Sequence, residues 1–222
     1  MNDSRMKIIT DYLCGFLPGA QLKQYVLPDC PEIKLWLLDD AFDDEVLSQS
    51  QVEVLSDDPP YWIFCWASGH ALASQIINGN VDVAGKTVLD FGSGSGVVAI
   101  AAAKAGAKKV IACEIDPIAQ QMIELNCDLN QVELCITKNL EESESTDIVL
   151  AADVLYEAKN LVWLDDFLLK AKDVVVADSR LKNLNHPAYR FKNAITTTSF
   201  PDYHEAKANN EVKFYFAGLE PK

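Results

Sequence analysis

Four residues between positions 90 and 96 have types and spacing that suit ligand binding: Asp90, Gly92, Gly94 and Gly96. Glycine tolerates positive φ and lets the backbone approach a ligand closely, so the three glycines predict a loop that holds a nucleotide-like ligand. The dinucleotide fingerprint G-x-G-x-x-G does not fit, because the residue after Gly96 is Val97. Asp90 would repel a diphosphate, so the pattern favours a ligand that carries a cation.

A second acid, Glu114, stands twenty residues after Gly94. A carboxylate at the carboxyl end of the next strand can accept hydrogen bonds from both hydroxyls of a ribose. Asp116 is a rival for this role, but Pro117 follows it, and Asp before Pro is typical of the start of a helix. We therefore predict Glu114 as the ribose ligand and Asp116 as a helix cap.

Asp153 and Tyr156 follow the fourth expected strand of the sheet, beside the point where ligands sit in open α/β folds. Ala151 and Ala152 leave room there for a close approach. The pair is interpreted as the acceptor side of a reaction site. A helix cap at Asp153 with a packed aromatic at 156 is the plainer alternative.

The elements that must position these residues alternate between strand and helix from Gly85 onward, which is typical of a parallel sheet with right-handed crossovers. A closing pair of strands has no helix between them and predicts an antiparallel hairpin. We expect strands at 87–91, 110–114, 134–137, 148–152, 174–177, 195–200 and 212–217. We expect helices at 97–105, 116–129, 160–170 and 187–193. The predicted fold is an α/β, doubly wound, mostly parallel seven-stranded Rossmann-like sheet with an antiparallel C-terminal hairpin.

The amino-acid pattern of residues 1–60 differs from that of residues 61–222, so we expect a small N-terminal extension and one larger domain. Residues 8–17 predict a short helix that ends at Pro18–Gly19. Residues 33–38 predict a strand, and residues 52–55 are its expected hairpin partner. A helix is expected at 70–78, after the aromatic cluster that spans 61–66.

The chain of 222 residues carries a net charge of −14 and has a sequence pI of about 4.5. Such a surface repels a phosphate backbone and attracts cationic partners, so a nucleic-acid partner is not expected. The six cysteines form no C-x-x-C pair and indicate reduced thiols, a cytoplasmic location and no metal site. No membrane span, secretory signal or transit peptide is expected. Nothing in the sequence indicates an oligomeric state.

One motif, at residues 58–61, is typical of a different class of enzyme. Residues 58–61 read Asp-Pro-Pro-Tyr, which is the signature of enzymes that methylate DNA adenine. In those enzymes the motif follows the fourth strand, whereas here it precedes the glycine loop. The acidic surface also disfavours DNA. We interpret the match as a coincidence.

The pattern D-x-G-x-G-x-G at 90–96 resembles motif I of class I S-adenosylmethionine-dependent methyltransferases. Together with Tyr-Trp-Ile-Phe-Cys-Trp at 61–66, Glu-Ile-Asp-Pro at 114–117 and Asp-Val-Leu-Tyr at 153–156, it resembles the seven-β-strand protein lysine methyltransferases called methyltransferase family 16. Within that family, these motifs and Pro-Glu-Ile-Lys-Leu at 31–35 are similar to the subgroup that acts on the electron transfer flavoprotein β subunit, and to its bacterial relatives. Two positions depart from the pattern: His70 replaces an expected Gln, and Ala-Asp-Ser-Arg at 177–180 replaces a Gly-Asp-Pro-Gly-Arg-like run.

The resemblance implies S-adenosylmethionine as cofactor, S-adenosylhomocysteine as product and a protein with an accessible lysine as acceptor. It implies that Asp153 orients the acceptor amine and that Tyr156 packs beside it. It further implies that Asn139 and Leu140 hold the adenine. The complete set of implied cofactor residues is Trp66, Asp90, Gly92, Gly94, Gly96, Glu114, Asn139, Leu140 and Ala152.

Three alternatives remain open from the sequence. The acceptor could be a small amine, as in proteins labelled nicotinamide methyltransferase-like. The chain could be a non-catalytic module that binds a partner protein. An NAD-dependent oxidoreductase is disfavoured by the glycine spacing.

Overall fold

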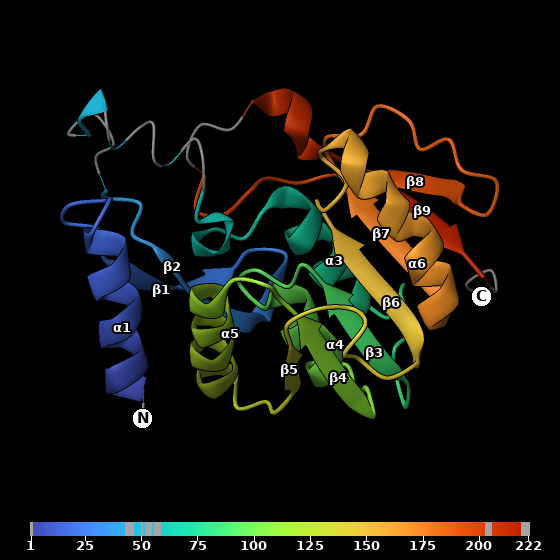
Figure 1. Ribbon diagram of the computed structural model, residues 1–222, viewed down its shortest axis with the longest axis horizontal. Coiled ribbons are helices and arrows are strands. Elements are labelled where there is room, and N and C mark those ends of the chain that lie inside the picture. Colours follow the sequence, from blue (N-terminus) through green and yellow to red (C-terminus); the bar gives the residue numbers. More distant parts are fainter. Residues whose placement is uncertain are drawn as a thin grey trace.

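The computed structural model describes residues 2–42, 47–49, 51, 55, 59–202 and 206–218. Its N-terminal part consists of a helix that packs beside α5 and a two-stranded antiparallel hairpin (Figure 1). Pro28 and Asp29 form the turn of the hairpin, and proline supplies the fixed φ that a tight turn needs. The elements are α1 (Asn2–Cys14), β1 (Leu22–Leu27), β2 (Cys30–Leu38) and the 3-10 turn η2 (Tyr61–Ile63).

A seven-stranded sheet with flanking helices follows, in the strand order β5-β4-β3-β6-β7-β9-β8. Strands β3 to β7 are parallel, and β9 runs antiparallel to both β7 and β8. The elements are α3 (Ala67–Ile77), β3 (Thr87–Phe91), α4 (Val97–Lys104), β4 (Lys109–Cys113), α5 (Pro117–Asn130), β5 (Cys135–Thr137), β6 (Thr146–Ala152), η3 (Ala158–Val162), α6 (Trp163–Lys170), β7 (Ala171–Asp178), β8 (Arg190–Thr196), η4 (Lys207–Asn210) and β9 (Glu211–Ala217).

The strand order reverses beside β3. The chain passes from β3 to β4 and β5 on one side, then returns to β6 and β7 on the other. Ligands of open α/β sheets bind in the crevice outside the carboxyl ends of the strands at such a reversal. The predicted doubly wound, mostly parallel sheet with an antiparallel closing hairpin is confirmed, and the reversal lies between the ends of β3 and β6.

Helix starts follow their local sequence signals. Asp116 caps α5, because its Oδ1 accepts a hydrogen bond from the backbone nitrogen of Ile118 at 2.7 Å, and Pro117 occupies the first helical position. This confirms the predicted cap.

Helix α4 has no polar face over its first six residues, all of which are buried, so it must lie between other elements rather than at the surface.

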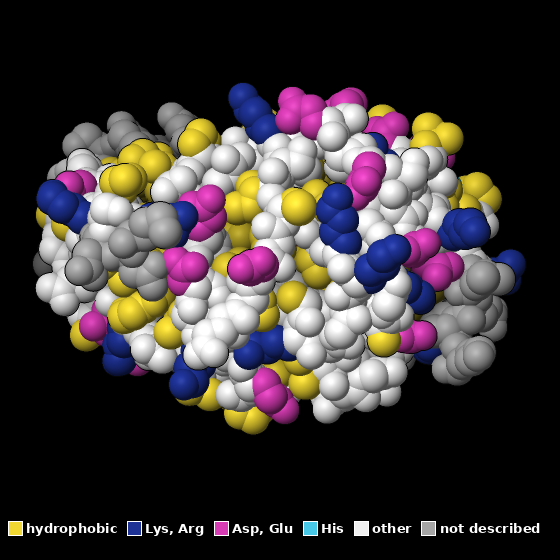
Figure 2. Space-filling model, turned by 90° about the horizontal axis from the view of Figure 1, so that it is seen from below, with side chains coloured by type: hydrophobic (Ala, Val, Ile, Leu, Met, Phe, Trp, Pro, Cys, Tyr) yellow, Lys and Arg dark blue, Asp and Glu magenta, His cyan; other side chains and the backbone are white. Residues whose placement is uncertain are grey.

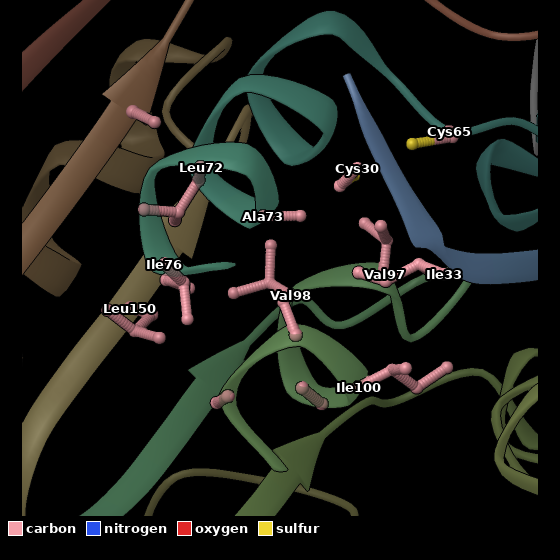
Figure 3. Packing of buried hydrophobic residues seen from close by; sticks show 14 of the residues in the cluster. Cys30, Ile33, Cys65, Leu72, Ala73, Ile76, Val97, Val98, Ile100 and Leu150 are labelled. Carbon is pink, nitrogen blue, oxygen red and sulfur yellow. The ribbon is translucent and has the colours of Figure 1, made fainter. Parts of the chain in front are cut away.

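Helices α3 and α4 pack on each other and on one face of the sheet, as Figure 3 shows. Gly69 permits the approach, since a Cβ atom built on it would lie 3.1 Å from Cγ1 of Val97. Truncating the fully buried Leu72 to Ala would cost about 2–5 kcal/mol of unfolding free energy. The labelled side chains of this cluster are Cys30, Ile33, Cys65, Leu72, Ala73, Ile76, Val97, Val98, Ile100 and Leu150.

The opposite face of the sheet is covered by α6, whose Phe167 is fully buried against Leu89 and Val149. A third cluster joins α1 to α5, with Ile9 and Leu13 facing Met122. The two faces together bury the central strands on both sides. Strands of this kind are mostly apolar, and for this reason the sequence predicts the strands at 148–152 and, despite Asp90, at 87–91.

Asn126 of α5 connects the N-terminal hairpin to the glycine loop. Its Oδ1 accepts a hydrogen bond from the backbone nitrogen of Trp36 at 2.7 Å, and its Nδ2 donates to the carbonyl of Ser95 at 2.9 Å. Asn130 repeats the contact with β2 one turn later, accepting from the nitrogen of Lys34 at 3.1 Å. The hairpin is therefore attached to the same helix that supports the loop after β3.

The predicted hairpin partner of residues 33–38 is wrong. Strand β2 pairs with β1, at 22–27, rather than with residues 52–55. Of the predicted partner, residues 52–54 lie outside the described part of the chain. Prolines before an apolar run indicate the boundary of a strand, but Pro28 starts the turn between two paired strands.

The predicted helix at 187–193 is also wrong, and the strand expected at 195–200 begins earlier. Residues 187 and 188 form a turn, and β8 occupies Arg190–Thr196. β8 is an edge strand whose first five side chains are exposed, so the sequence lacks the apolar alternation by which a strand is recognised. Pairing with β9 rather than local propensity determines its conformation.

Acidic and basic side chains are interspersed on the face seen from below, and apolar side chains lie scattered between them (Figure 2). No helix in the described ranges is long and apolar enough to cross a membrane. Among the same residues, no group of three or more His, Cys, Asp or Glu side chains could hold a metal ion. All six cysteines are free, and Cys113 and Cys135 lie in strands as expected.

Candidate active site

The loop after β3 turns through three glycines with left-handed backbone. Gly92, Gly94 and Gly96 have φ angles of +68°, +53° and +83°, which residues with a side chain rarely adopt. A Cβ atom built on Gly92 would lie 2.7 Å from Cγ1 of Val154, so the loop touches the segment after β6. A Cβ atom on Gly94 would meet no described atom nearer than 3.9 Å apart from its chain neighbours. A methyl group would therefore fit at Gly94 without a clash, in ordinary contact with Gly92 and Trp62.

Glu114 holds this loop from the end of β4. Its Oε2 accepts a hydrogen bond from the backbone nitrogen of Gly94 at 2.8 Å, and its Oε1 accepts from the nitrogen of Asp116 at 3.0 Å. The side chain is only 9 % exposed, and this burial raises the pKa of the carboxyl, while the two hydrogen bonds oppose the rise. Each oxygen keeps one acceptor site for a ligand hydroxyl, which suits the predicted ribose contact.

Asp90 holds the glycine loop through hydrogen bonds of its buried carboxylate. Its Oδ2 accepts hydrogen bonds from Ser93 Oγ at 2.6 Å and from the nitrogen of Ala99 at 3.1 Å, so it ties the loop to the first turn of α4. Burial raises the pKa of Asp90 to about 7, and the hydrogen bonds from Ser93 and Ala99 act in the opposite direction. A cation bound near the loop would favour the ionised carboxylate.

Asp153 follows β6 with a left-handed backbone, at a φ of +51°. Its Oδ1 accepts hydrogen bonds from Ser68 Oγ at 2.7 Å, from Ser179 Oγ at 2.9 Å and from the nitrogen of Ser179 at 3.0 Å. Its Oδ2 accepts from the nitrogen of Ser68 at 3.2 Å. Asp153 does not cap a helix of its own, since the next element starts at Ala158; it caps the first turn of α3 instead.

An aromatic surface lies beside this acid. The ring of Tyr61 lies 5.9 Å from Trp66 and 5.7 Å from Tyr156, and Phe64 lies 5.3 Å from Trp66, between ring centroids. The guanidinium of Arg180 stands 5.3 Å above the Trp66 ring. Ring faces attract cations, and the Trp66 ring already carries the Arg180 guanidinium, so Tyr61 and Tyr156 are the rings of this surface that can receive a further positively charged group.

Tyr156 is 46 % exposed at the rim of this surface. Burial, with a further contribution from Tyr61, raises the pKa of the Tyr156 phenol, so the hydroxyl stays protonated at neutral pH. Ala152, which precedes Asp153, pairs with Ala177 of β7 and is half-buried. Ala152 ends β6 and Tyr156 follows it in the sequence, as the predicted strand at 148–152 implies.

The side chains of Asn139 and Leu140 contact residues other than the predicted ligand-binding residues. Leu140 is 5 % exposed and packs in the core with Leu89 and Ile111. The side chain of Asn139 donates to Glu142 Oε1 at 3.0 Å and accepts from the nitrogen of Glu142 at 3.1 Å. Their role toward an adenine stays a prediction. Ile115, which the sequence did not single out, is 70 % exposed beside Glu114 and offers an apolar surface there.

Sequence reasoning missed the partners of Asp153. Ser68 and Ser179 come from α3 and from the end of β7, and no spacing in the sequence relates them to Asp153. The sequence also assigns no role to Arg180, which ends the Ala-Asp-Ser-Arg run at 177–180. Its neighbour Asp178 accepts from the nitrogens of Arg180 and Leu181 at 2.8 and 2.7 Å and so shapes the turn that carries the guanidinium.

The site therefore has two sides that meet at the contact between Gly92 and Val154. One side consists of the glycine loop and Glu114, which together offer open space, backbone amides and a carboxylate. The other side consists of Asp153 and the aromatic surface, which suit an amine or another cation. A cationic nucleoside ligand on the first side would face an amine on the second.

A family model described as ribosomal protein L11 methyltransferase matches residues 72–176. The mouse (Mus musculus) electron transfer flavoprotein beta subunit lysine methyltransferase is 40 % identical over 116 residues, which cover 49 % of this chain and 46 % of that protein. Its Xenopus laevis counterpart is 31 % identical over 185 residues, which cover 79 % of this chain and 74 % of that protein. The mouse alignment thus spans less than half of that relative's length, and the frog alignment about three quarters.

Among solved structures, a magnesium protoporphyrin IX methyltransferase from Synechocystis PCC 6803, solved with bound SAM, superposes with a TM-score of 0.53. It is 12 % identical, and the match covers 81 % of this chain and 88 % of that chain. At this identity the likeness concerns the fold alone.

Proposed function

The chain belongs to the family of the electron transfer flavoprotein beta subunit lysine methyltransferases, and on that premise we propose that it is an S-adenosylmethionine-dependent protein lysine Nε-methyltransferase. The contact between Gly92 and Val154 carries the proposal. It puts the glycine loop directly against the segment that holds Asp153 and Tyr156. A methyl donor and its acceptor must lie near contact distance, and this junction provides such a place.

The residues of the loop side fit S-adenosylmethionine. The space beside Gly94, which a Cβ atom would enter without a clash, suits the methionine part of the cofactor. The buried Glu114 carboxylate retains acceptor sites for the two ribose hydroxyls. The bound cofactor supplies an electrophilic methyl group on a sulfonium. Gly92, Gly96, Trp66 and Ala152 are the further cofactor contacts that we propose, together with Asn139 and Leu140.

On the acceptor side, Asp153 would orient the substrate amine with a carboxylate oxygen. Tyr156 would attract the lysine while it is still an ammonium, because its ring face favours positive charge, and Trp66 would pack beside it with Arg180 over its ring. The amine must be neutral when it reacts. A lysine that leaves bulk water for this surface loses its proton to solvent more readily, so no strong base is required.

For the acceptor protein we propose an electron transfer flavoprotein β subunit, which is the target named for the mouse and frog relatives. Ribosomal protein L11 is the second candidate, because the family model that matches 72–176 is named for it. The net charge of −14 favours a lysine-rich protein surface and disfavours a nucleic acid as acceptor. The six free thiols support action in the cytoplasm.

A panel of acceptors tests the proposal. The purified protein is incubated with S-adenosylmethionine labelled in the methyl group, and with electron transfer flavoprotein β subunit, ribosomal protein L11 or nicotinamide in parallel. We expect label in the flavoprotein subunit, and no label when Asp153→Ala replaces the wild-type protein. Label in nicotinamide alone would contradict protein methylation. S-adenosylhomocysteine binding without transfer to any acceptor would favour a non-catalytic module.

A further inference from the structure

The two carboxylate oxygens of Asp153 are unequal in their hydrogen bonds. Oδ1 accepts three, from Ser68 Oγ, Ser179 Oγ and the nitrogen of Ser179, whereas Oδ2 accepts one, from the nitrogen of Ser68. A carboxylate oxygen offers about two acceptor sites. Oδ1 is therefore saturated, and Oδ2 keeps one site open. An approaching amine would be bound by Oδ2.

The donors come from two elements that lie far from Asp153 in the sequence. Ser68 lies in the first turn of α3 and is 0 % exposed, and Ser179 follows β7 and is 9 % exposed. Ser68 contacts both oxygens, so it fixes the plane of the carboxylate as well as its position. The backbone amides at the start of α3 also carry partial positive charge, which attracts the carboxylate to this helix end.

The left-handed backbone of Asp153 makes this arrangement specific. A φ of +51° is uncommon for a residue with a side chain. It turns the carboxylate toward α3 and the end of β7 instead of along its own segment. The adjacent nitrogen of Asp153 is held by the carbonyl of Ala177 at 3.0 Å, so both the backbone and the side chain are fixed from β7.

We propose that Ser68 and Ser179 are positioning residues that hold Asp153 so that Oδ2 faces the acceptor amine. This inference rests on the proposed methyltransferase function, in which Asp153 orients that amine. Both serine hydroxyls donate to Oδ1, which is not the oxygen that would bind the amine. Their effect on the reaction passes through the carboxylate, and this distinguishes them from serines that only stabilise the fold.

Ser199 is the matched control. It is 4 % exposed, and its Oγ accepts a hydrogen bond from the nitrogen of Ala67 at 3.1 Å, in the same first turn of α3. The four side-chain hydrogen bonds of Asp153 described above come from Ser68 and Ser179, not from Ser199. Ser199→Ala therefore reports what the loss of a buried hydroxyl at this helix end does to the fold without displacing Asp153.

The first experiment compares turnover of Ser68→Ala, Ser179→Ala and Ser199→Ala, with labelled S-adenosylmethionine and the electron transfer flavoprotein β subunit or ribosomal protein L11 as acceptor. We expect kcat to fall about tenfold to hundredfold in the first two variants, as displacement of a reacting group predicts. S-adenosylhomocysteine affinity should not change. Ser179→Thr, which keeps the hydroxyl, should recover most of the rate. Wild-type turnover in both Ser→Ala variants, or equal loss in Ser199→Ala, would overturn the inference.

A double-mutant cycle identifies the route of the effect. In an Asp153→Asn background, Ser68→Ala and Ser179→Ala should change kcat little, because the carboxylate through which they act is gone. An undiminished effect of the serine substitutions in that background would overturn the inference.

The same cycle is read by melting temperature, which needs no acceptor. The combined shift of Ser68→Ala with Asp153→Ala should be smaller than the sum of the single shifts, since both remove one set of hydrogen bonds. Additive shifts would overturn the inference. If the wild-type protein methylates no acceptor, the proposed function fails, and the melting cycle still decides whether the serines hold Asp153.

Discussion

Glu114 Oε2 accepts a hydrogen bond from the backbone nitrogen of Gly94 at 2.8 Å. The carboxylate that ends β4 therefore fixes the shape of the glycine loop that ends β3. The same carboxylate is the proposed ribose ligand. Loop geometry and cofactor binding thus depend on one side chain, which is more than the sequence alone predicted for Glu114.

We predict that Glu114→Ala weakens S-adenosylhomocysteine binding by about 1.5–3 kcal/mol, the range for a hydrogen bond to a charged group. Calorimetric titration measures the affinity, and a thermal melt shows that the variant is folded. Glu144→Ala is the control, because the Glu144 carboxylate is exposed and pairs with Lys109 away from the loop. Unchanged affinity in folded Glu114→Ala would reject Glu114 as a ligand.

Gly94→Ala should abolish cofactor binding at a modest cost in stability. The left-handed φ of +53° makes a side chain unfavourable by about 1–2 kcal/mol, but the new Cβ atom clashes with nothing in the protein. Gly79→Ala is the matched variant, since Gly79 has a φ of +75° and a Cβ atom built on it would meet nothing within 4 Å. Both variants should melt at similarly lowered temperatures, and only Gly94→Ala should lose S-adenosylhomocysteine. Normal binding by Gly94→Ala would show that the space beside it is not the cofactor site.

Asp153→Ala should lower both stability and turnover. A loss of turnover alone would indicate a catalytic role and a loss of stability alone a helix cap, but the carboxylate accepts four hydrogen bonds in the fold, so Asp153→Ala changes both. Loss of these partners would cost about 1–3 kcal/mol for each buried donor left unpaired. The diagnostic variant is therefore Asp153→Asn, which keeps the side-chain shape.

For Asp153→Asn we expect a melting temperature nearer to that of the wild type and a single-turnover methylation rate reduced at least tenfold, about 1.4 kcal/mol of lost transition-state stabilisation. S-adenosylhomocysteine affinity should stay unchanged. A normal rate per folded molecule in this variant would leave Asp153 with a structural role alone.

Asp90 should make stability depend on pH. Its pKa is raised to about 7 in the folded protein, above about 3.9 in the unfolded chain, so the folded state holds the proton more tightly between these values. The free energy of unfolding should therefore fall as the pH rises from about 4 to about 7, and level off above it. The difference between wild type and Asp90→Asn in urea unfolding across this range measures the contribution. A difference that is constant with pH would contradict the raised pKa.

The central sheet was predictable because its strands are buried on both faces. Ile148–Ala152 is a continuous apolar run, Thr87–Phe91 is apolar apart from Thr87 and Asp90, and Asp116–Pro117 marks a helix start by local chemistry. The glycines at 92, 94 and 96 were equally visible, since a left-handed backbone leaves glycine as the residue without a steric cost. In each case the residues of one short segment are sufficient to predict its structure.

The remaining features depend on contacts between distant segments. β8 has exposed side chains, and its pairing with β9 determines its conformation. Its local sequence therefore predicts a helix instead of a strand. The pairing of β1 with β2 depends on reading Pro28 as part of a turn. Ser68 and Ser179 meet Asp153 across 85 and 26 positions of the chain, and a single sequence carries no mark of such a meeting.

The most direct test of the proposed activity is tandem mass spectrometry of the electron transfer flavoprotein β subunit after incubation with this protein and S-adenosylmethionine deuterated in the methyl group. The expected result is the deuterated methyl group on the Nε atom of lysine, formed by the wild-type protein and not by Asp153→Ala. A deuterated methyl group on another residue type, or its absence from every lysine while S-adenosylhomocysteine binds normally, would contradict lysine methylation of this acceptor.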